Sequence, residues 1–405
     1  MEVHYFNLNI ESNFDFPRDI EKTKSKIFNI IDNFTAFKII RNKKLFEKTL
    51  TDTKNFAAGK NNFIVFGTGG SNLGARALNK IKLNANVEIE FHDNIDPLSF
   101  ESKMRSINID ETGFIFISKS GETIETISQF LSVIEMAKIK NKETSLYSNT
   151  MIITENKDSS LHKIALKKKC LILEHHKDIG GRYSIFSNVG IVPAILTGIN
   201  IPNLYNGALS FIDNLEKNYD LCASKYLCFK EDKSFLINIL MTYSDQLFYF
   251  GKWYLQLWAE SIGKNNKGIT AIHSVGTTDQ HSQLQLYLDG PKDKFFTFIT
   301  TDHQNKGLKL NNETAETINA RYIINKSMGD IMHAEQKATI ETFKLKKIPF
   351  RQIHIPNIDE FSLGKLLALS MVETIASCTY LNVNPFNQPA VEQGKILTKK
   401  FLTEF

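Results

Sequence analysis

Apolar and polar residues follow an alternating pattern along most of this chain. From residue 63, short runs of β-branched and aromatic residues are separated by longer amphipathic stretches with helical spacing. Buried strands divided by helices are typical of a parallel sheet flanked by helices. The strands predicted for this first block are residues 63–67, 87–91, 114–118, 151–154 and 170–173.

A second block repeats this alternation and predicts strands at 269–275, 295–300 and 350–355. We therefore predict two open α/β domains, residues 56–204 and 205–405. Residues 1–55 are polar, contain helical pieces and have few strand-like runs, so they are predicted to form an N-terminal helical extension. The chain closes with helical segments at 362–381 and 391–402, separated by a proline-containing segment.

Composition narrows the class of protein. A chain of 405 residues is long enough for two domains. The net charge of +5 is scattered along the sequence, so no nucleic-acid partner is expected. The four cysteines lack metal-site spacing, and no signal peptide or run of about 18 apolar residues is evident. We expect a cytoplasmic protein with reduced thiols and no membrane partner.

The first strand is followed by GTGGSNLG (67–74) and then by a helical pattern. Glycines let the backbone approach a ligand closely, and a helix start presents free N–H groups with partial positive charge. The spacing matches neither the dinucleotide fingerprint nor a Walker loop. Taken alone, the segment is equally consistent with a tight turn.

A second loop, SKSGET (118–123), follows the third strand and precedes a helix at 124–139. Its hydroxyls and amides suit a phosphate monoester, and both loops follow strands, where parallel sheets bind ligands. Alternatively, Ser120 and Thr123 only cap the helix, and Lys119 is a solvated surface lysine.

Two other segments carry charged groups suited to acid-base chemistry. In QLWAESIGK (256–264), Gln256 and Glu260 share one face of an apolar helix. Glu260 suits a general base, although a partly exposed glutamate paired with Lys252 or Lys264 fits the pattern too. Arg182 follows two glycines and is consistent either with anion binding or with an ordinary salt bridge.

His281 lies in the polar segment GTTDQHSQ (276–283), where it can exchange protons near neutral pH. A structural, hydrogen-bonded histidine fits this position equally well. His175 and His176 are adjacent, which is not metal-ligand spacing on a helix, and the sequence has no HExxH motif or acidic metal loop. We assign no metal.

Five segments in order resemble the glucose-6-phosphate isomerase (phosphoglucose isomerase) family: GTGGSNLG, SKSGETIET, GGRYSIFSNVG, QLWAESIGK with GTTDQHSQ, and NPFNQPAVEQGK. The resemblance implies an α/β fold of two sugar isomerase (SIS) domains, each a three-layer αβα sandwich with a parallel sheet, plus N- and C-terminal helical segments. It also implies a homodimer with shared active sites that interconverts glucose 6-phosphate and fructose 6-phosphate through a cis-enediolate, without a cofactor.

The resemblance also implies roles for individual residues. Glu260 resembles the base that moves a proton between C2 and C1, and Arg182 the cation beside the enediolate. His281 and Lys395 resemble the ring-opening pair, with the histidine coming from the neighbouring subunit. The matched contacts to the sugar and its phosphate are Gly70, Ser71, Ser118, Lys119, Ser120, Thr123, Gln256 and Gln388.

The sequence departs from the family pattern at a few positions. Asn387 stands where aspartate is usual, and Ala390 where glycine is usual. In the second loop, Gly121 and Glu122 replace a more common pair, which removes a hydroxyl and adds a carboxylate. This last departure bears on the affinity for phosphate.

Three other functions compete with this interpretation. A broader isomerase would also accept mannose 6-phosphate, because the same enediol serves both sugars. A SIS-type regulatory module would bind sugar phosphates without turnover and would not need Glu260, Arg182 and Lys395. A nucleotide-dependent oxidoreductase would need a GxGxxG fingerprint with a downstream acid, which is not evident.

Overall fold

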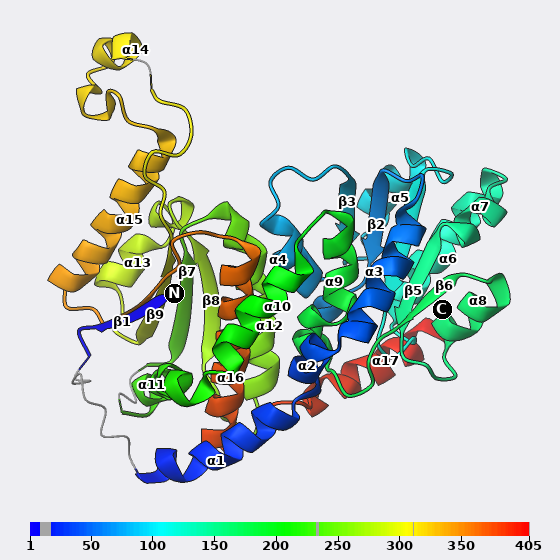
Figure 1. The fold of residues 1–405 in the computed structure, drawn as a ribbon, viewed down its shortest axis with the longest axis horizontal. Coiled ribbons are helices and arrows are strands. Elements are labelled where there is room, and N and C mark those ends of the chain that lie inside the picture. The colour runs from blue at the N-terminus through cyan, green and yellow to red at the C-terminus, as the bar shows by residue number, and fades with distance from the viewer. Residues whose placement is uncertain (9–17, 232–234, 311, 405) are drawn as a thin grey trace.

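The computed structural model describes residues 1–8, 18–231, 235–310 and 312–404. Two five-stranded sheets lie in separate halves of the molecule, with helices between and around them (Figure 1). The strands are β1 (Glu2–Phe6), β2 (Asn62–Phe66), β3 (Glu88–His92), β4 (Thr112–Ile117), β5 (Thr150–Thr154), β6 (Leu171–Glu174), β7 (Ile237–Thr242), β8 (Thr270–Val275), β9 (Lys294–Thr300) and β10 (Phe350–His354).

Helices account for most of the remaining chain. They are α1 (Arg18–Asn33), α2 (Thr35–Lys38), α3 (Lys43–Ala57), α4 (Leu73–Lys80), α5 (Pro97–Arg105), α6 (Ile124–Ile139), α7 (Glu143–Ser148), α8 (Ser160–Lys168), α9 (Asn188–Leu196), α10 (Ile201–Ile212), α11 (Leu215–Glu231), α12 (Phe248–Ile262), α13 (Leu284–Asp289), α14 (Asn312–Thr317), α15 (Met328–Leu345), α16 (Glu360–Tyr380) and α17 (Glu392–Leu402).

The first sheet has the order β3-β2-β4-β5-β6 and is parallel throughout. Aromatic side chains of β2 and β4 on one face pack against α6, including Phe130 and Val133. The opposite face packs against α3 and α9 through Phe56, Val189 and Val192. Because both faces are covered, this half is a three-layer αβα sandwich, as expected.

The second sheet has the order β1-β10-β9-β7-β8 and differs from the expectation in two ways. Strand β7 was not predicted, because a continuous apolar run cannot be separated from a buried helix by periodicity alone. Strand β1 lies in the segment expected to be helical, and it pairs antiparallel with β10. The second sheet is therefore mostly, not wholly, parallel. The predicted domain boundaries near residues 55 and 204 stay a prediction.

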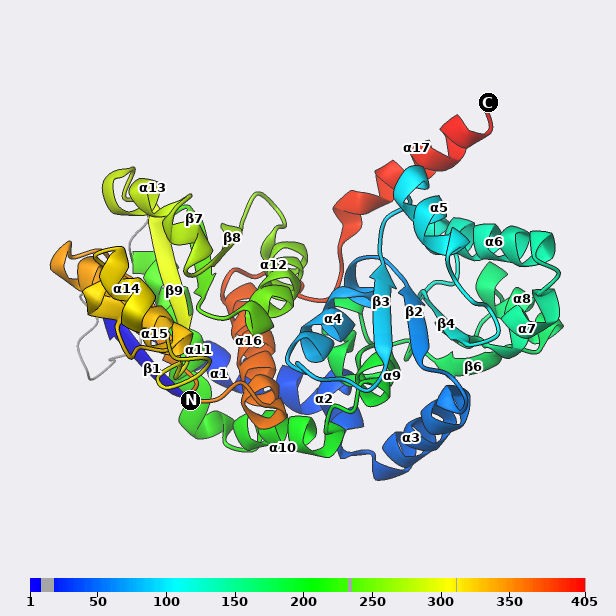
Figure 2. The same cartoon turned by 90° about the horizontal axis from the view of Figure 1, so that it is seen from above.

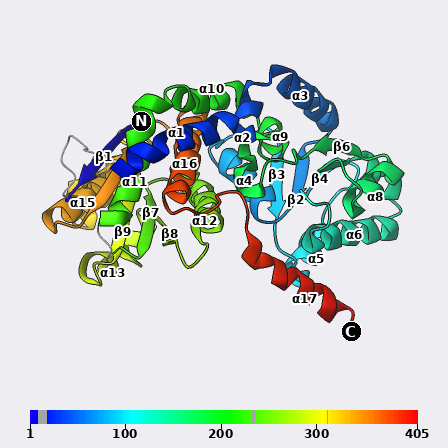
Figure 3. The same cartoon turned by 90° about the horizontal axis from the view of Figure 1, so that it is seen from below.

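Helix α16 runs through the second half beside α10 and α12, as two further views show (Figures 2 and 3). Among the described residues it is the one helix long and apolar enough to cross a membrane by length and composition, which the sequence pattern did not indicate. However, 83% of its most apolar window is buried inside the fold. A core helix of a folded domain has these same properties.

The two halves share one apolar core. Side chains of α4 and of the 3₁₀ helix η3 (Gly181–Phe186) from the first half join side chains of α12 and α16 from the second. Consequently the segments that follow β2 and β6 are held against α12, where Glu260 lies. This junction places the predicted site residues within reach of one another.

Candidate active site

The glycine loop, residues 67–72, is the centre of the site. Gly70 packs so closely on Gly181 that a Cβ atom on Gly70 would lie 2.1 Å from the Gly181 carbonyl carbon. Gly69 has a positive φ of 53°, and a Cβ atom there would lie 2.9 Å from Nε2 of Gln256. Only glycine allows this approach, so the loop brings η3 and α12 together. Ser71 follows at a half-buried position.

Arg182 is buried, with 1% of its surface exposed, and all five of its N–H donors have acceptors. These acceptors belong to α12 and to the closing segment, residues 384–388, which links α16 to α17. Nε donates to Ser261 Oγ (2.8 Å), Nη1 to Glu260 Oε2 (3.1 Å) and to Gln388 Oε1, and Nη2 to the main-chain oxygens of Pro385 (2.6 Å) and Asn387 (3.2 Å).

The contact with Asn387 bears on one of the departures from the family pattern, the asparagine in place of the usual aspartate. Arg182 uses the main-chain oxygen of residue 387, which asparagine and aspartate supply equally. The replaced side chain therefore does not alter this interaction.

Glu260 lies on the last turn of α12, with 32% of its side chain exposed. Its Oε1 accepts a hydrogen bond from Gln256 Nε2 at 3.0 Å, and its Oε2 accepts from Arg182. The carboxylate is thus held at both oxygens while part of it stays accessible. Neither of the lysine partners considered from the sequence binds the carboxylate, since Lys264 contacts only main-chain oxygens.

Two residues beside Glu260 were not predicted as functional site residues, although they lie in the same motif. Ser261 is fully buried and binds both Arg182 Nε and the Tyr183 hydroxyl, the latter at 3.0 Å. Lys264 Nζ donates to the main-chain oxygens of Glu260 (2.7 Å) and Ser261 (2.6 Å), which caps the C-terminus of α12. Desolvation, together with the nearby Arg182 charge, lowers the Lys264 pKa. Their positions, one and four residues after Glu260, were the signal in the sequence that could have identified them.

The serine loop, residues 118–123, follows β4, which pairs with β2 in the sheet. The buried Ser118 hydroxyl lies 2.8 Å from the Thr123 hydroxyl and accepts a hydrogen bond from Gly121 N (3.2 Å). Thr123 is the N-cap residue of α6, yet its side chain makes no capping hydrogen bond. The first-turn N–H groups of α6 are therefore not closed by a side chain and can receive an anion, unlike in the simple capping alternative.

Lys119 and Glu122, at the rim of this loop, contact the segment that follows β5. Lys119 Nζ lies 3.6 Å from Glu155 Oε1. Glu122, whose carboxylate was a concern for phosphate binding, accepts hydrogen bonds from Ser160 N (2.6 Å) and Ser160 Oγ (2.9 Å). The Glu122 charge is thus directed to the N-terminus of α8, where a carboxylate is favourable. Ser120 Oγ accepts a hydrogen bond from Glu122 N (3.1 Å).

The remaining two predicted catalytic residues are not brought to Glu260 by this chain. His281 is exposed after the 3₁₀ helix η5 (Thr278–Gln280). Lys395 is exposed on α17 and pairs with Glu392 of the same helix at 2.7 Å. Within the described part of the chain, neither side chain contacts Glu260, Arg182 or Gln388. The predicted roles of His281 and Lys395 therefore stay predictions.

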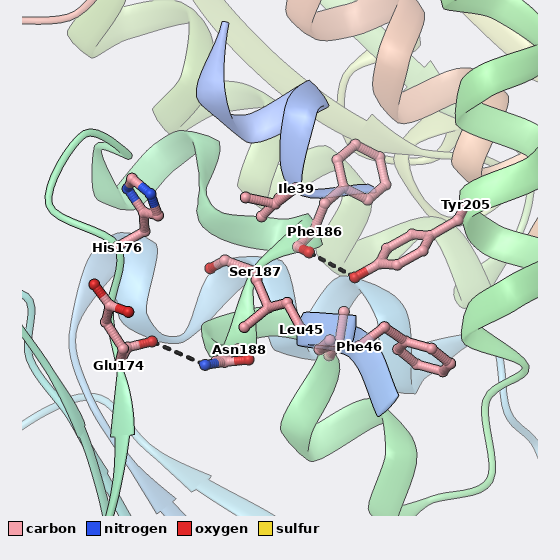
Figure 4. Close-up of a pocket in the computed structure, with 10 residues that line it drawn as sticks. Ile39, Leu45, Phe46, Glu174, His176, Phe186, Ser187, Asn188 and Tyr205 are labelled. Carbon is pink, nitrogen blue, oxygen red and sulfur yellow. Dashed lines mark hydrogen bonds between the residues drawn. The ribbon is translucent and has the colours of Figure 1, made fainter. Parts of the chain in front are cut away.

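A small pocket lies behind η3, away from these residues (Figure 4). Two of its polar side chains bond to main-chain oxygens of the fold. The Tyr205 hydroxyl donates to Phe186 O (2.8 Å), and Asn188 Nδ2 donates to Glu174 O (2.9 Å). None of the predicted site residues lines this pocket. We interpret it as a packing gap whose hydrogen bonds hold η3, and with it Arg182, in place.

The site therefore combines a carboxylate with two fixed oxygens, a buried cation beside it, and a loop rich in hydroxyls at the end of β4. These groups can bind a phosphorylated, polar substrate and move a proton on it. Two α/β halves, each built on a mostly parallel sheet, with a site at their junction place this protein in the sugar isomerase (SIS) class.

Comparisons with known proteins agree with this class. The profile of the phosphoglucose isomerase family matches residues 35–405. Glucose-6-phosphate isomerase of Methanocaldococcus jannaschii is 33% identical over 347 residues, 83% of each chain. That of Campylobacter jejuni is 33% identical over 352 residues, 84% of this chain and 85% of the relative. This chain belongs to the phosphoglucose isomerase family.

Solved structures share the fold. A hypothetical protein from Thermus thermophilus superposes with a TM-score of 0.87 at 22% identity, covering 99% of this chain and 100% of that one. A glucose-6-phosphate isomerase from Chlamydia trachomatis superposes with a TM-score of 0.76 at 21% identity, covering 89% of this chain and 73% of that one. At such identities the likeness concerns the fold alone.

Proposed function

We propose that this chain is a glucose-6-phosphate isomerase, which interconverts glucose 6-phosphate and fructose 6-phosphate. The observation that carries the proposal is the Glu260 carboxylate, fixed by Gln256 and Arg182 beside the glycine loop. The membership of the phosphoglucose isomerase family supports the same substrates.

In the proposed reaction, Glu260 takes the proton from C2 of the open-chain aldose and returns it to C1. The intermediate is a cis-enediolate, whose negative oxygen requires a nearby cation, and Arg182 is the buried cation beside Glu260. The serine loop and the first turn of α6 bind the phosphate. Remote binding of the phosphate orients the reacting carbons, and no redox step is involved.

A general base alone does not lower the activation barrier enough for enzymatic catalysis. A positioned general base supplies about 10²- to 10⁴-fold, or roughly 3 to 5.5 kcal/mol, whereas enzymatic accelerations begin near about 8 kcal/mol. Electrostatic stabilisation of the enediolate contributes roughly another 3 to 4 kcal/mol. Glu260 and the Arg182 charge together therefore reach the lower end of the enzymatic range.

The direct test is a coupled assay in which fructose 6-phosphate is the substrate and a glucose-6-phosphate dehydrogenase reports the product. A chelator is included, and mannose 6-phosphate is assayed beside it. Metal-independent turnover of fructose 6-phosphate is expected. Folded protein without turnover of either substrate would overturn the proposal.

We expect Ser118→Ala and Thr123→Val to raise KM for fructose 6-phosphate about tenfold each, since a hydrogen bond to a charged group contributes roughly 1.5 kcal/mol. A smaller fall in kcat is expected, because phosphate binding also orients the sugar. Steady-state kinetics give both constants. Ser148→Ala, an exposed serine whose hydroxyl binds Ser145 O, is the matched control. An unchanged KM would argue against this loop as the phosphate site.

We further propose a homodimer in which His281 of one subunit completes the site of the other. Helix α17 supports this proposal, since it projects from the body (Figure 2) and every described residue from 386 to 404 is exposed. Its apolar side chains include Ile396, 63% exposed, and Phe401, 51% exposed. A second copy that covers α17 would bury them.

The four free, buried cysteines are consistent with a cytoplasmic location, which also stays a proposal.

Mixed dimers test the shared site. Glu260→Gln and His281→Ala should each be impaired alone, but a hybrid dimer has one site with both native residues. Random reassortment should recover about a quarter of wild-type activity, because about half of the dimers are hybrids and each has one intact site. Mixing Glu260→Gln with Arg182→Lys is the control, because both residues belong to the same chain's half-site. No recovery in the first mixture would refute sharing.

A further inference from the structure

The donor count of Arg182 poses a chemical problem for the proposed reaction. Every N–H group of its guanidinium already has a protein acceptor. An enediolate oxygen can therefore receive a hydrogen bond from Arg182 only if one of these acceptors is displaced. The five acceptors differ in how readily an oxyanion can replace them.

Three of the five contacts are fixed by the fold. Ser261 is fully buried and is also bound by the Tyr183 hydroxyl. The other two acceptors are main-chain oxygens, of which that of Pro385 is bound by Tyr183 as well. Displacing any of these would require the closing segment or α12 to move.

The two contacts of Nη1 are different, because both acceptors are accessible side chains. Glu260 and Arg182 are both charged, so their hydrogen bond is assisted by charge on both sides. Gln388 offers only a neutral amide oxygen, and it lies on an exposed stretch of chain. An incoming oxyanion therefore competes best with Gln388.

We propose that Gln388 is a gate on Arg182. Its amide oxygen covers Nη1 until the substrate binds, and the enediolate oxygen then takes its place. The proposal rests on the proposed isomerase function. It is compatible with the predicted role of Gln388, because the displaced amide becomes free to bind the sugar or its phosphate.

Because Gln388 is exposed, displacing its amide oxygen from Nη1 costs little free energy. Gln388 follows Pro385, whose backbone is anchored by Arg182, while every described residue from 386 onward is exposed. The Gln388 side chain has no other hydrogen-bond partner among the described residues. Rotation of this one side chain uncovers the donor and leaves the anchored contacts in place.

Two ligands with the same phosphate separate a gate from an ordinary binding contact. Arabinonate 5-phosphate carries a carboxylate where the enediolate charge develops, and glucitol 6-phosphate carries a neutral chain. Calorimetric Kd values are measured for wild type, Gln388→Ala and Gln388→Glu. Gln285→Ala, at an exposed glutamine of α13, serves as the control.

In Gln388→Ala the donor is uncovered, so the preference for the carboxylate ligand over the neutral one should rise about tenfold. In Gln388→Glu a carboxylate competes for Nη1, so the same preference should fall below that of wild type. If both ligands weaken equally in Gln388→Ala, Gln388 is a simple binding contact and the gate is refuted. Because the readout is a ratio of affinities, a general structural role of Gln388 does not change it.

Failure of the proposed function gives a different result. A wild-type protein that binds both ligands but does not isomerise fructose 6-phosphate would refute the function, while the ratio would still decide the gate. A wild-type protein that binds neither ligand would overturn both proposals.

Discussion

Glu260→Gln is expected to lower kcat for fructose 6-phosphate by about 10²- to 10⁴-fold, the contribution of a positioned general base. The amide keeps the size of the side chain and can still accept a hydrogen bond from Arg182, but it cannot take a proton from carbon. KM should change little, because the phosphate and sugar contacts remain. Stopped assays with long incubation and calorimetric binding of glucitol 6-phosphate measure the two effects.

The matched control for this change is Glu341→Gln, which removes an exposed glutamate that pairs with Lys344 on α15. It should leave kcat at the wild-type value. Circular dichroism of Glu260→Gln should match that of the native protein, since the carboxylate is one-third exposed and the amide has nearly the same shape. The amide oxygen can accept from Arg182, whereas the hydrogen bond from Gln256 Nε2 is lost unless the Gln256 amide turns over. Near-normal turnover by Glu260→Gln would show that another group moves the proton.

Arg182→Lys is expected to lower kcat by about 10²- to 10³-fold even though the charge is retained. Lysine has three donors on one nitrogen, whereas Arg182 uses a planar fork to bind five acceptors in two segments. The Glu260 carboxylate then loses its fixed orientation, and the closing segment loses its anchor. Hydrogen exchange of residues 384–391 should become faster, which kinetics alone would not reveal.

Arg105→Lys is the control for this substitution, because Arg105 forms an exposed pair with Glu101 at the surface, with 81% of its side chain exposed. Neither kcat nor hydrogen exchange should respond to it. If Arg182→Lys retained most of its activity, a positive charge near the enediolate would suffice for catalysis. The hydrogen bonds of the guanidinium, including those at Nη1, would then not be required.

The serine loop illustrates how a sequence departure can be misjudged without coordinates. Glu122 replaces an uncharged residue of the family pattern beside the hydroxyls proposed to bind phosphate, and on the sequence alone it adds a repelling charge. The structure directs its carboxylate to Ser160, at the start of α8. The local environment, not the residue type, decides where a charge acts.

The sequence by itself determined the parts of this protein that depend on local order. The alternation of apolar runs and amphipathic stretches predicted all of the first sheet, and β8, β9 and β10 of the second, within a few residues. The loops after β2 and β4 were placed correctly at strand ends and predicted to bind a ligand, because strand ends, glycines and hydroxyls are recognisable within a short window. The helical position of Gln256 and Glu260 on one face was predicted in the same way.

Only the tertiary structure decided the contacts between distant segments. The pairing of β1 with β10 joins residues 2–6 to residues 350–354, and no local pattern specifies it. The close packing of Gly70 on Gly181, and the five acceptors that surround Arg182, arise where η3, α12 and the closing segment meet. Periodicity reports which face of an element is buried but not what it is buried against. The helical pattern and the family motifs named Arg182, Glu260 and Gln388, and the fold decided their mutual geometry.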